Sequence, residues 1–190
     1  MADPLRPGRG GFLRPFGCGW FIREYLLGHG PEGSPKIEPE MGAPIVDIRY
    51  HYKEALYRAF AADAAAYEIE RLIKAGKPPS EEKKEEIERY FYERIPYKIT
   101  KCRHHSFHVY FGVLKRLLWV EFTGREEPSA IQENCPEPPA APRRYYRLTE
   151  EGKKAPGVSW SNPLRTLYQY PLEELREKRK KHKYTRKGRR

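Results

Sequence analysis

The spacing of apolar residues in the second half of the chain predicts a helix followed by two strands. Apolar side chains recur three and four positions apart, which is typical of one helical face: Phe107, Tyr110, Leu114, Leu117 and Leu118. Apolar and polar residues then alternate over 119–123 and again over 144–148, as they do in half-buried strands. We therefore expect a helix over about 104–118, a strand, a long Pro-rich loop over about 124–143 and a returning strand.

The first half of the chain predicts two longer helices. Residues 45–75 are rich in alanine, and the Gly-Lys-Pro-Pro run that follows predicts that the helix stops there. Ser80 is a suitable N-cap for a second helix, because two glutamates then lie in its first turn. Up to Ile95 this second helix carries six acidic and four basic residues, so we do not expect it to lie against phosphates.

The order helix, strand, long loop and strand is that of the second half of a winged helix. The segments LKRLLWVE and RRYYRLTEEGKKA, on either side of the long loop, resemble winged-helix transcriptional regulators of the PadR and MarR type. The resemblance covers residues 106–155. It implies that residues 106–118 form a recognition helix in the major groove and that residues 123–144 form the wing. The expected fold class is mainly α with a small β-hairpin (α+β), a winged helix-turn-helix with an irregular N-terminal arm and a basic C-terminal tail.

Changes in composition along the chain predict four segments. They are an irregular Gly/Pro-rich arm, the winged-helix domain, a C-terminal extension and a basic tail, over residues 1–44, 45–156, 157–175 and 176–190. Within the arm, Trp20 to Leu27 form an apolar island that is compatible with a short amphipathic helix. It either packs on the surface of the domain itself or docks a protein partner. The helix over 45–75 either belongs to the core of the domain or joins two copies of the chain as a homodimer.

Most of the positive charge lies at the C-terminal end of the chain. The net charge is +11, and residues 176–190 contribute +9 of it, from ten basic residues and Glu177. A block of like charge suits a polyanion, and phosphate binding through counterion release is its natural use. An anionic membrane surface, an acidic protein and a merely solubilising end are the alternatives. No apolar run approaches the roughly 20 residues that span a bilayer, so we expect no membrane insertion.

The candidate nucleic-acid contacts follow from this charge and from the expected fold. They lie at the start and end of the recognition helix, on the wing and in the tail: Arg103, His104, His105, His108, Lys115, Arg116, Arg125, Arg143, Arg144, Arg147, Arg179, Lys180, Lys181, Lys183, Arg186, Lys187, Arg189 and Arg190. Double-stranded DNA is the expected ligand. Gly112 in the recognition helix predicts a close approach of the backbone, either to a packing helix or to DNA.

The residues give little indication of catalysis or of a bound metal. Cys102, His104, His105 and His108 are ligand types close together in the sequence, but no CxxC pair accompanies them and a fourth ligand is not obvious. The motifs GxSxG, GxxxxGK[ST] and HExxH are all missing from the chain. We therefore expect no enzyme activity, no metal and no cofactor.

The sequence thus predicts a DNA-binding protein of winged-helix type, acting in transcription regulation or as an architectural factor. One alternative is an RNA-binding or ribonucleoprotein component, in which tyrosines beside arginines (Tyr50, Tyr90, Tyr145 and Tyr146) stack on bases. The other is a protein-interaction module built on a winged-helix scaffold. Three widely spaced cysteines suit a reducing compartment, so we expect a cytoplasmic protein, associated with the nucleoid if the source is prokaryotic.

Overall fold

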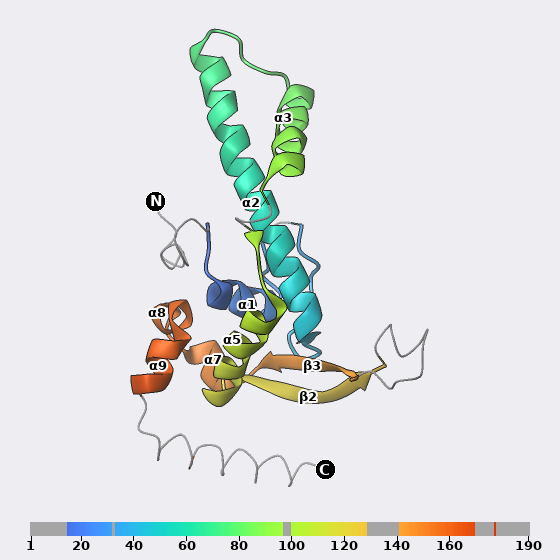
Figure 1. Ribbon diagram of the computed structural model, residues 1–190, viewed down its shortest axis with the longest axis vertical. Helices are drawn as coiled ribbons and strands as arrows, with labels where there is room; N and C mark the ends of the chain where they lie inside the picture. Colours follow the sequence, from blue (N-terminus) through green and yellow to red (C-terminus); the bar gives the residue numbers. More distant parts are fainter. Residues whose placement is uncertain (1–14, 32, 97–99, 129–140, 170–176, 178–190) are drawn as a thin grey trace.

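The protein is mainly helical and carries one small antiparallel sheet. A computed structural model describes residues 15–31, 33–96, 100–128, 141–169 and 177. Its elements in chain order (Figure 1) are α1 (Cys18–Leu26), β1 (Ala43–Pro44), α2 (Ile45–Lys74), α3 (Glu81–Arg94), α5 (His104–Arg116), β2 (Val120–Glu127), β3 (Arg143–Leu148), α7 (Glu150–Lys154), α8 (Gly157–Ser161) and α9 (Pro163–Gln169). This content confirms the α+β class expected from the sequence.

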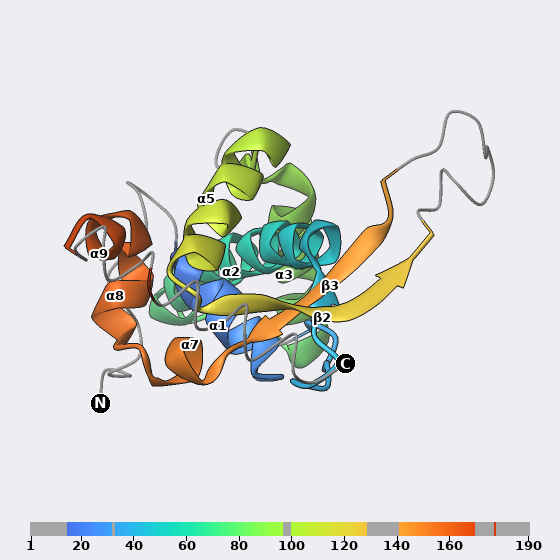
Figure 2. The same cartoon turned by 90° about the horizontal axis from the view of Figure 1, so that it is seen from below.

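The sheet has three strands, in the order β1-β3-β2, with both pairings antiparallel. Strands β2 and β3 form the expected hairpin, in which Val120 lies opposite Leu148 and Phe122 opposite Tyr146. The register shifts between Phe122 and Glu126, beyond which the ribbon runs out past the helices (Figure 2). The two-residue strand β1 adds a third strand that the sequence pattern does not predict.

The hydrophobic core joins both ends of the described chain. One cluster of buried side chains extends from Phe16 to Leu167, and its largest fully buried members include Trp160, Tyr52 and Phe21. The rings of Trp119 and Trp160 lie 4.8 Å apart between centroids. The folded unit is therefore not limited to residues 45–156, because residues of the expected arm and of the expected C-terminal extension fill its centre.

The expectation of an irregular N-terminal arm is wrong for residues 18–26, whereas the described residues between Leu26 and Ala43 form no helix or strand. Residues 18–26 form α1, whose Phe21, Ile22 and Leu26 have no exposed surface, and Tyr25 is 2 % exposed. Of the two alternatives for Trp20–Leu27, this burial favours packing within the domain over docking of a protein partner. Nine residues cannot hold a stable helix alone, so α1 exists because its apolar face is buried in the core and is not available to a partner.

Helix α5 begins where expected and ends two residues earlier. Phe107, Leu114 and Leu117 are buried as the spacing predicts, and Phe111 has no exposed surface. Leu118 does not continue the helical face, because its φ of 60° places it in the left-handed region beyond the helix end. The amide of Trp119 donates to the carbonyl oxygen of Leu114 at 3.0 Å and closes the last turn.

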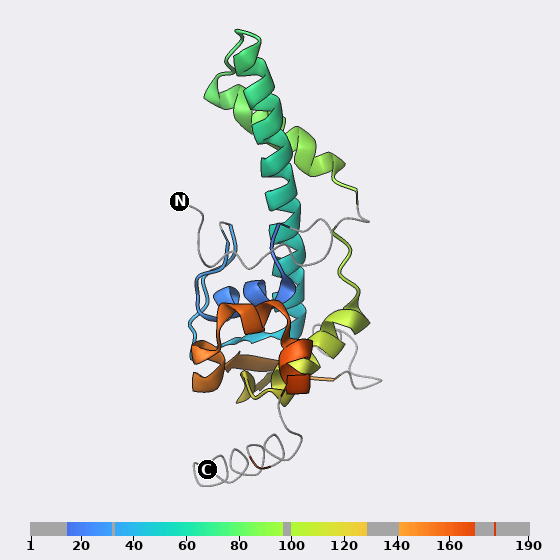
Figure 3. The same cartoon turned by 90° about the vertical axis from the view of Figure 1, so that its left-hand side faces the viewer.

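Helices α2 and α3 confirm the two helices expected in the first half of the chain. The Ser80 side chain accepts a hydrogen bond from the Lys83 amide at 3.3 Å and caps α3, while Gly76, at φ +73°, follows the end of α2. With 30 residues, α2 is about 45 Å long. Its second half and α3 form a hairpin that projects from the body (Figures 1 and 3). Of the helices in the described ranges, none combines the length and apolar character needed to cross a bilayer.

The turn into α7 depends on a glycine. Thr149 caps α7 by accepting a hydrogen bond from the Gly152 amide at 3.0 Å. Gly152 is buried, and a Cβ built on it would lie deep inside the van der Waals radius of the Trp119 carbonyl oxygen. The Trp160 indole nitrogen donates to the Gly152 carbonyl oxygen at 3.1 Å. Only glycine therefore allows α7 to pack this closely against the start of β2.

We expect Gly152→Ala to lower the free energy of unfolding by about 3 kcal/mol, the upper end of the usual cost of overpacking, because the new methyl group meets a backbone atom that must move. For a chain of this length, the melting temperature should fall by roughly 6–12 °C. Gly157→Ala in α8 is the matched control, because a Cβ there meets nothing within 4 Å. It should leave thermal denaturation almost unchanged, and equal losses in both variants would contradict the packing described here.

Candidate nucleic-acid interface

The exposed basic residues of α5 lie at its two ends, and most of its apolar residues lie on the opposite, buried face, with Val109 as the exposed exception. Phe107, Phe111, Val113 and Leu114 are buried, whereas the basic residues of the helix and the one before it are at the surface. Arg103, His104, His105, Lys115 and Arg116 are exposed, and His108 is half-buried. The sequence of α5 contains no carboxylate, so nothing on the helix itself compensates this charge.

Two histidines near the start of α5 lie against each other, and His108 also lies near Arg49 of α2. The rings of His104 and His108 are 4.0 Å apart between centroids. Burial lowers the pKa of His108 below its ordinary value, and the positive groups around it lower the pKa further: His104, Arg49, Lys115 and His105. At neutral pH His108 is therefore mainly uncharged, and Arg49 and Arg103 carry positive charge at this end of α5.

Arg49 belongs to this site although the sequence pattern does not indicate it. It lies in the first turns of α2, and its Nη1 donates to the Cys102 carbonyl oxygen at 3.0 Å, just before α5. The rings of Tyr52 and Phe107, 6.4 Å apart between centroids, hold the same two helices together. A contact between residues 53 positions apart has no local sequence signal, so only the tertiary packing brings this arginine to α5.

Lys115 at the other end of α5 is partly engaged within the protein. Its Nζ lies 5.1 Å from the centroid of the Tyr146 ring and 3.5 Å from the Tyr146 hydroxyl. The Tyr146 ring is itself held in the core by Phe111, at 5.2 Å between centroids. Lys115 therefore has a fixed position beside β3, whereas the neighbouring Arg116 forms no ion pair with any described residue.

The arginines of the β2–β3 ribbon differ from those of α5, because each has an acidic partner. Arg144 Nε lies 2.8 Å from Glu126, Arg143 lies 2.5 Å from Asp47 at the start of α2, and Arg125 pairs with Glu127. Arg147 contacts two carboxylates, Glu121 at 3.0 Å and Glu40 at 2.6 Å. The four expected wing contacts therefore lie in a set of ion pairs along the strands.

The chemistry of Glu127 supports this description of the ribbon. The Tyr145 hydroxyl donates to its carboxylate at 2.6 Å, and this hydrogen bond, with that of Arg125, holds the pKa of Glu127 below its ordinary value. The carboxylate therefore remains ionised at neutral pH. Opposite charges on the two strands, REE over 125–127 against RR at 143–144, are a signal from which these cross-strand pairs could have been found.

The structure thus divides the described candidate residues into two groups, and the remaining candidates lie outside the described residues. The residues around α5 carry positive charge without acidic partners, whereas the residues of the ribbon are paired. Wing residues 129–140, with Cys135, lie outside the described residues. So do the tail positions Arg179, Lys180, Lys181, Lys183, Arg186, Lys187, Arg189 and Arg190.

The described residues bring together no metal-ligand set. The rings of His104 and His108 lie close together at a tilt, but nowhere in the described part of the chain do three His, Cys, Asp or Glu side chains converge. Among the tyrosines beside arginines, Tyr146 is buried, and the ring of Tyr90 is covered by the Arg94 guanidinium at 3.8 Å. The aromatic surface for stacking bases is therefore smaller than the sequence indicates.

Comparison with known proteins adds no assignment. The chain matches no protein-family model, no curated protein and no solved structure.

Proposed function

We propose that the protein binds double-stranded DNA through a winged-helix module in which α5 is the recognition helix. The order of elements supports this proposal: α1, the short strand β1, α2, then α5 followed by the β2–β3 ribbon. The sheet order β1-β3-β2 agrees with such a module. Its second helix is then the first half of α2 and its third is α5, and the hairpin formed by the second half of α2 and by α3 is an extension between them. In this arrangement α5 faces the major groove and the ribbon is the wing.

The observation that carries the proposal is the uncompensated positive charge on the exposed side of α5. Arg103 and Arg116, at the two ends of the helix, have no acidic partner in the described parts of the chain. A Cβ built on Gly112 would meet nothing within 4 Å, so close packing against another helix does not explain this glycine. Its open backbone leaves room for a close approach to a groove.

The paired arginines give the wing a smaller part in this proposal than α5. A phosphate would have to compete with Glu126, Glu127 and Asp47 for their guanidinium groups. The basic tail supplies further phosphate contacts that carry no sequence information. Such a protein would act in transcription regulation or in shaping DNA, with recognition by α5 and affinity from α5 and the tail.

The test is a salt titration of duplex binding by the full chain and by a chain ending at residue 175. Each phosphate contact contributes about 0.9 to the slope of log affinity against log salt on B-DNA. If about five of the ten basic residues in the tail hold phosphates, the truncated chain should show a slope smaller by about 4.5. Its loss of affinity should be the same factor for every duplex, whatever the base sequence.

The same titration with single-stranded DNA and with structured RNA tests the alternatives. Tighter binding of RNA than of duplex DNA at equal salt would replace the proposal with a ribonucleoprotein role. If none of the three nucleic acids shows salt-dependent binding, the winged helix is a scaffold for protein interaction. An unchanged slope after truncation would show that the tail does not touch phosphates.

A further inference from the structure

The start of α5 gathers basic and ionisable side chains from two helices. His104, His105 and His108 belong to α5, Arg103 precedes it, and Arg49 belongs to α2. The rings of His104 and His108 lie 4.0 Å apart between centroids, and Arg49 is held near them by its hydrogen bond to the backbone just before α5. These five residues form the histidine cluster.

Two buried nitrogen atoms of the histidine cluster have no hydrogen-bond partner among the described residues. They are His108 Nε2 and Arg49 Nε, and the charge of Arg49 acts on His108. Since most buried polar side-chain atoms in proteins are paired, an unpaired one needs an explanation. Two of them in one basic cluster indicate a place that an external acceptor, such as a phosphate oxygen, would complete.

The charged groups that act on His108 are all positive. His104, His105 and Lys115 lie on its own helix, and Arg49 lies on α2. Burial lowers the pKa of His108 below its ordinary value, and each of these four groups lowers it further. A proton on His108 is therefore unfavourable unless a negative charge approaches the histidine cluster.

The carboxylates of the elements that pack against α5 are engaged elsewhere. In the first half of α2, Asp47 pairs with Arg143, and Glu54 accepts a hydrogen bond from the Tyr92 hydroxyl at 2.8 Å. The only charged residue of α9 is Arg165. The carboxylates of β2 pair with arginines of the ribbon: Glu121 with Arg147, Glu126 with Arg144 and Glu127 with Arg125. None of these carboxylates acts on His108.

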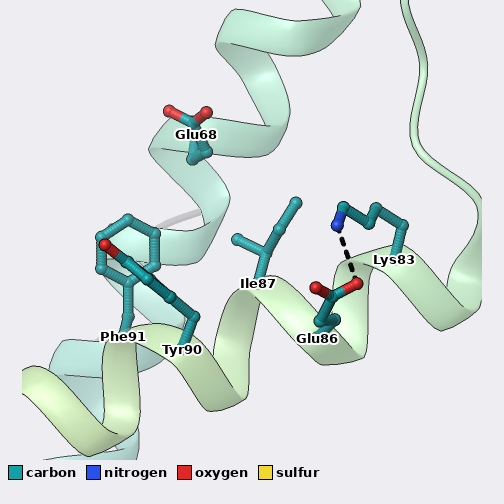
Figure 4. A pocket seen from close by; sticks show the side chains of 6 residues that line it. All are labelled: Glu68, Lys83, Glu86, Ile87, Tyr90 and Phe91. Atoms are coloured by element: carbon teal, nitrogen blue, oxygen red, sulfur yellow. Dashed lines mark hydrogen bonds and ion pairs between the residues drawn. The ribbon is translucent and has the colours of Figure 1, made fainter.

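The α2–α3 hairpin shows the opposite arrangement of charge. Beside the hollow of about 420 Å³ between its two helices, Lys83 lies 2.7 Å from Glu86 (Figure 4). The hydrogen bond from Lys83 lowers the pKa of Glu86, so this carboxylate stays ionised at neutral pH and its pair is already closed. An anion that approached this pair would change no protonation state, whereas an anion at the histidine cluster would change that of His108.

We infer that the histidine cluster is a phosphate site that takes up a proton on binding, so that the protein holds duplex DNA more tightly at acid pH than at alkaline pH. The inference rests on the proposed function, because the DNA backbone supplies the phosphate. A phosphate held by Arg103 and His104 would lie within the screening length of His108, which is about 10 Å at 0.1 M salt. Its charge favours the protonated ring.

The direction of the pH dependence follows from linkage. A bound phosphate raises the pKa of His108 above its value in the free protein, so the complex binds more protons than its separate parts. The affinity therefore increases as the pH falls from the pKa of the complex toward the lower pKa of the free protein. A difference of about one pKa unit corresponds to a tenfold change of affinity.

The experiment measures binding of one DNA duplex by the full chain at constant salt, between about pH 5.5 and pH 8.5, the range in which histidine changes its charge. The parent chain should bind about tenfold more tightly at the acid end. Isothermal titration calorimetry in two buffers of different ionisation enthalpy should show proton uptake near pH 6. His108→Gln, which cannot take up the proton, should lose most of the pH dependence and of the uptake.

His29→Gln is the matched control, because this ring is 72 % exposed and lies in the loop after α1, outside the histidine cluster. It should keep the pH dependence of the parent chain. Far-UV circular dichroism checks that His108→Gln is folded. If it is not, the NMR titration of the His108 ring protons in the parent chain decides, because the pKa should be higher with duplex than without it.

Three results would overturn the inference. They are duplex binding by the parent chain that does not change with pH, proton uptake that persists in folded His108→Gln, and an equal pKa of His108 in the free and bound protein. Each of them leaves the proposed function in place, because the duplex is still bound. Failure to bind duplex at every pH would instead contradict the proposed function itself, and the inference with it.

Discussion

Replacing Arg103 and Arg116 by glutamine is expected to weaken duplex binding about 60-fold at 0.1 M salt. Both side chains are exposed at the two ends of α5, and neither forms an ion pair with a described residue. If each holds one phosphate, the double variant loses two contacts of about 0.9 each in the slope of log affinity against log salt. Extrapolated from 1 M to 0.1 M salt, a slope smaller by about 1.8 gives this factor.

The control for this prediction removes the same formal charge from the β2–β3 ribbon. Arg125→Gln with Arg144→Gln breaks the pairs with Glu127 and Glu126, so the net charge falls by two, as in the α5 variant. We expect the slope to remain as in the parent chain and the affinity to fall only a few-fold through long-range repulsion, which salt screens within about 10 Å at 0.1 M. Equal changes of slope in the two variants would show that the wing arginines leave their carboxylates to bind phosphate.

The sequence was sufficient to predict those helices and strands that a local signal determines. Helix α3 could be placed because Ser80 caps it and glutamates fill its first turn, and α2 because Gly76 and prolines follow it. The β2–β3 hairpin follows from alternation, and the buried face of α5 from residues spaced by three and four. Propensity, caps and periodicity act within one or two turns of chain, which is the range over which a single sequence can be interpreted.

The elements that the sequence left open or did not indicate depend on contacts between distant residues. Helix α1 lies between Pro/Gly-rich stretches that indicate irregular chain, and its burial against Tyr52 and Trp160 decides its structure. A signal was nevertheless present. An island as apolar as Trp20 to Leu27 is too short to be stable as a free helix, so its large side chains had to find a core.

The candidate site likewise has features that the sequence predicts and features that depend on the fold. The exposure of the basic residues on α5 follows from the helical period. The spacing of the apolar residues determines which face is buried, and the basic residues then lie outside that face. The ion pairs of the ribbon depend on the register of two strands and on the place of Asp47 at the start of α2. A list of basic residues therefore identifies the charged groups of a surface, whereas their availability to phosphate is a property of the fold.

Leu114→Ala is expected to lower the free energy of unfolding by about 2–5 kcal/mol. The side chain has no exposed surface and belongs to the cluster that joins α5 to α2 and to the sheet, so its removal loses buried area and leaves a cavity. Since domains have only about 5–15 kcal/mol in total, a large fraction of the variant should be unfolded at 37 °C, with the loss measured by urea denaturation.

Val109→Ala on the same helix is the control, because Val109 is 55 % exposed and alanine favours helix. Its urea midpoint should therefore match that of the parent chain or exceed it slightly. Duplex binding by Leu114→Ala at 10 °C, where the folded fraction is larger, should approach that of the parent, because no contact residue is altered. If the two variants unfold alike, Leu114 does not face the core, and the opposite face of α5 is then not the one presented to DNA.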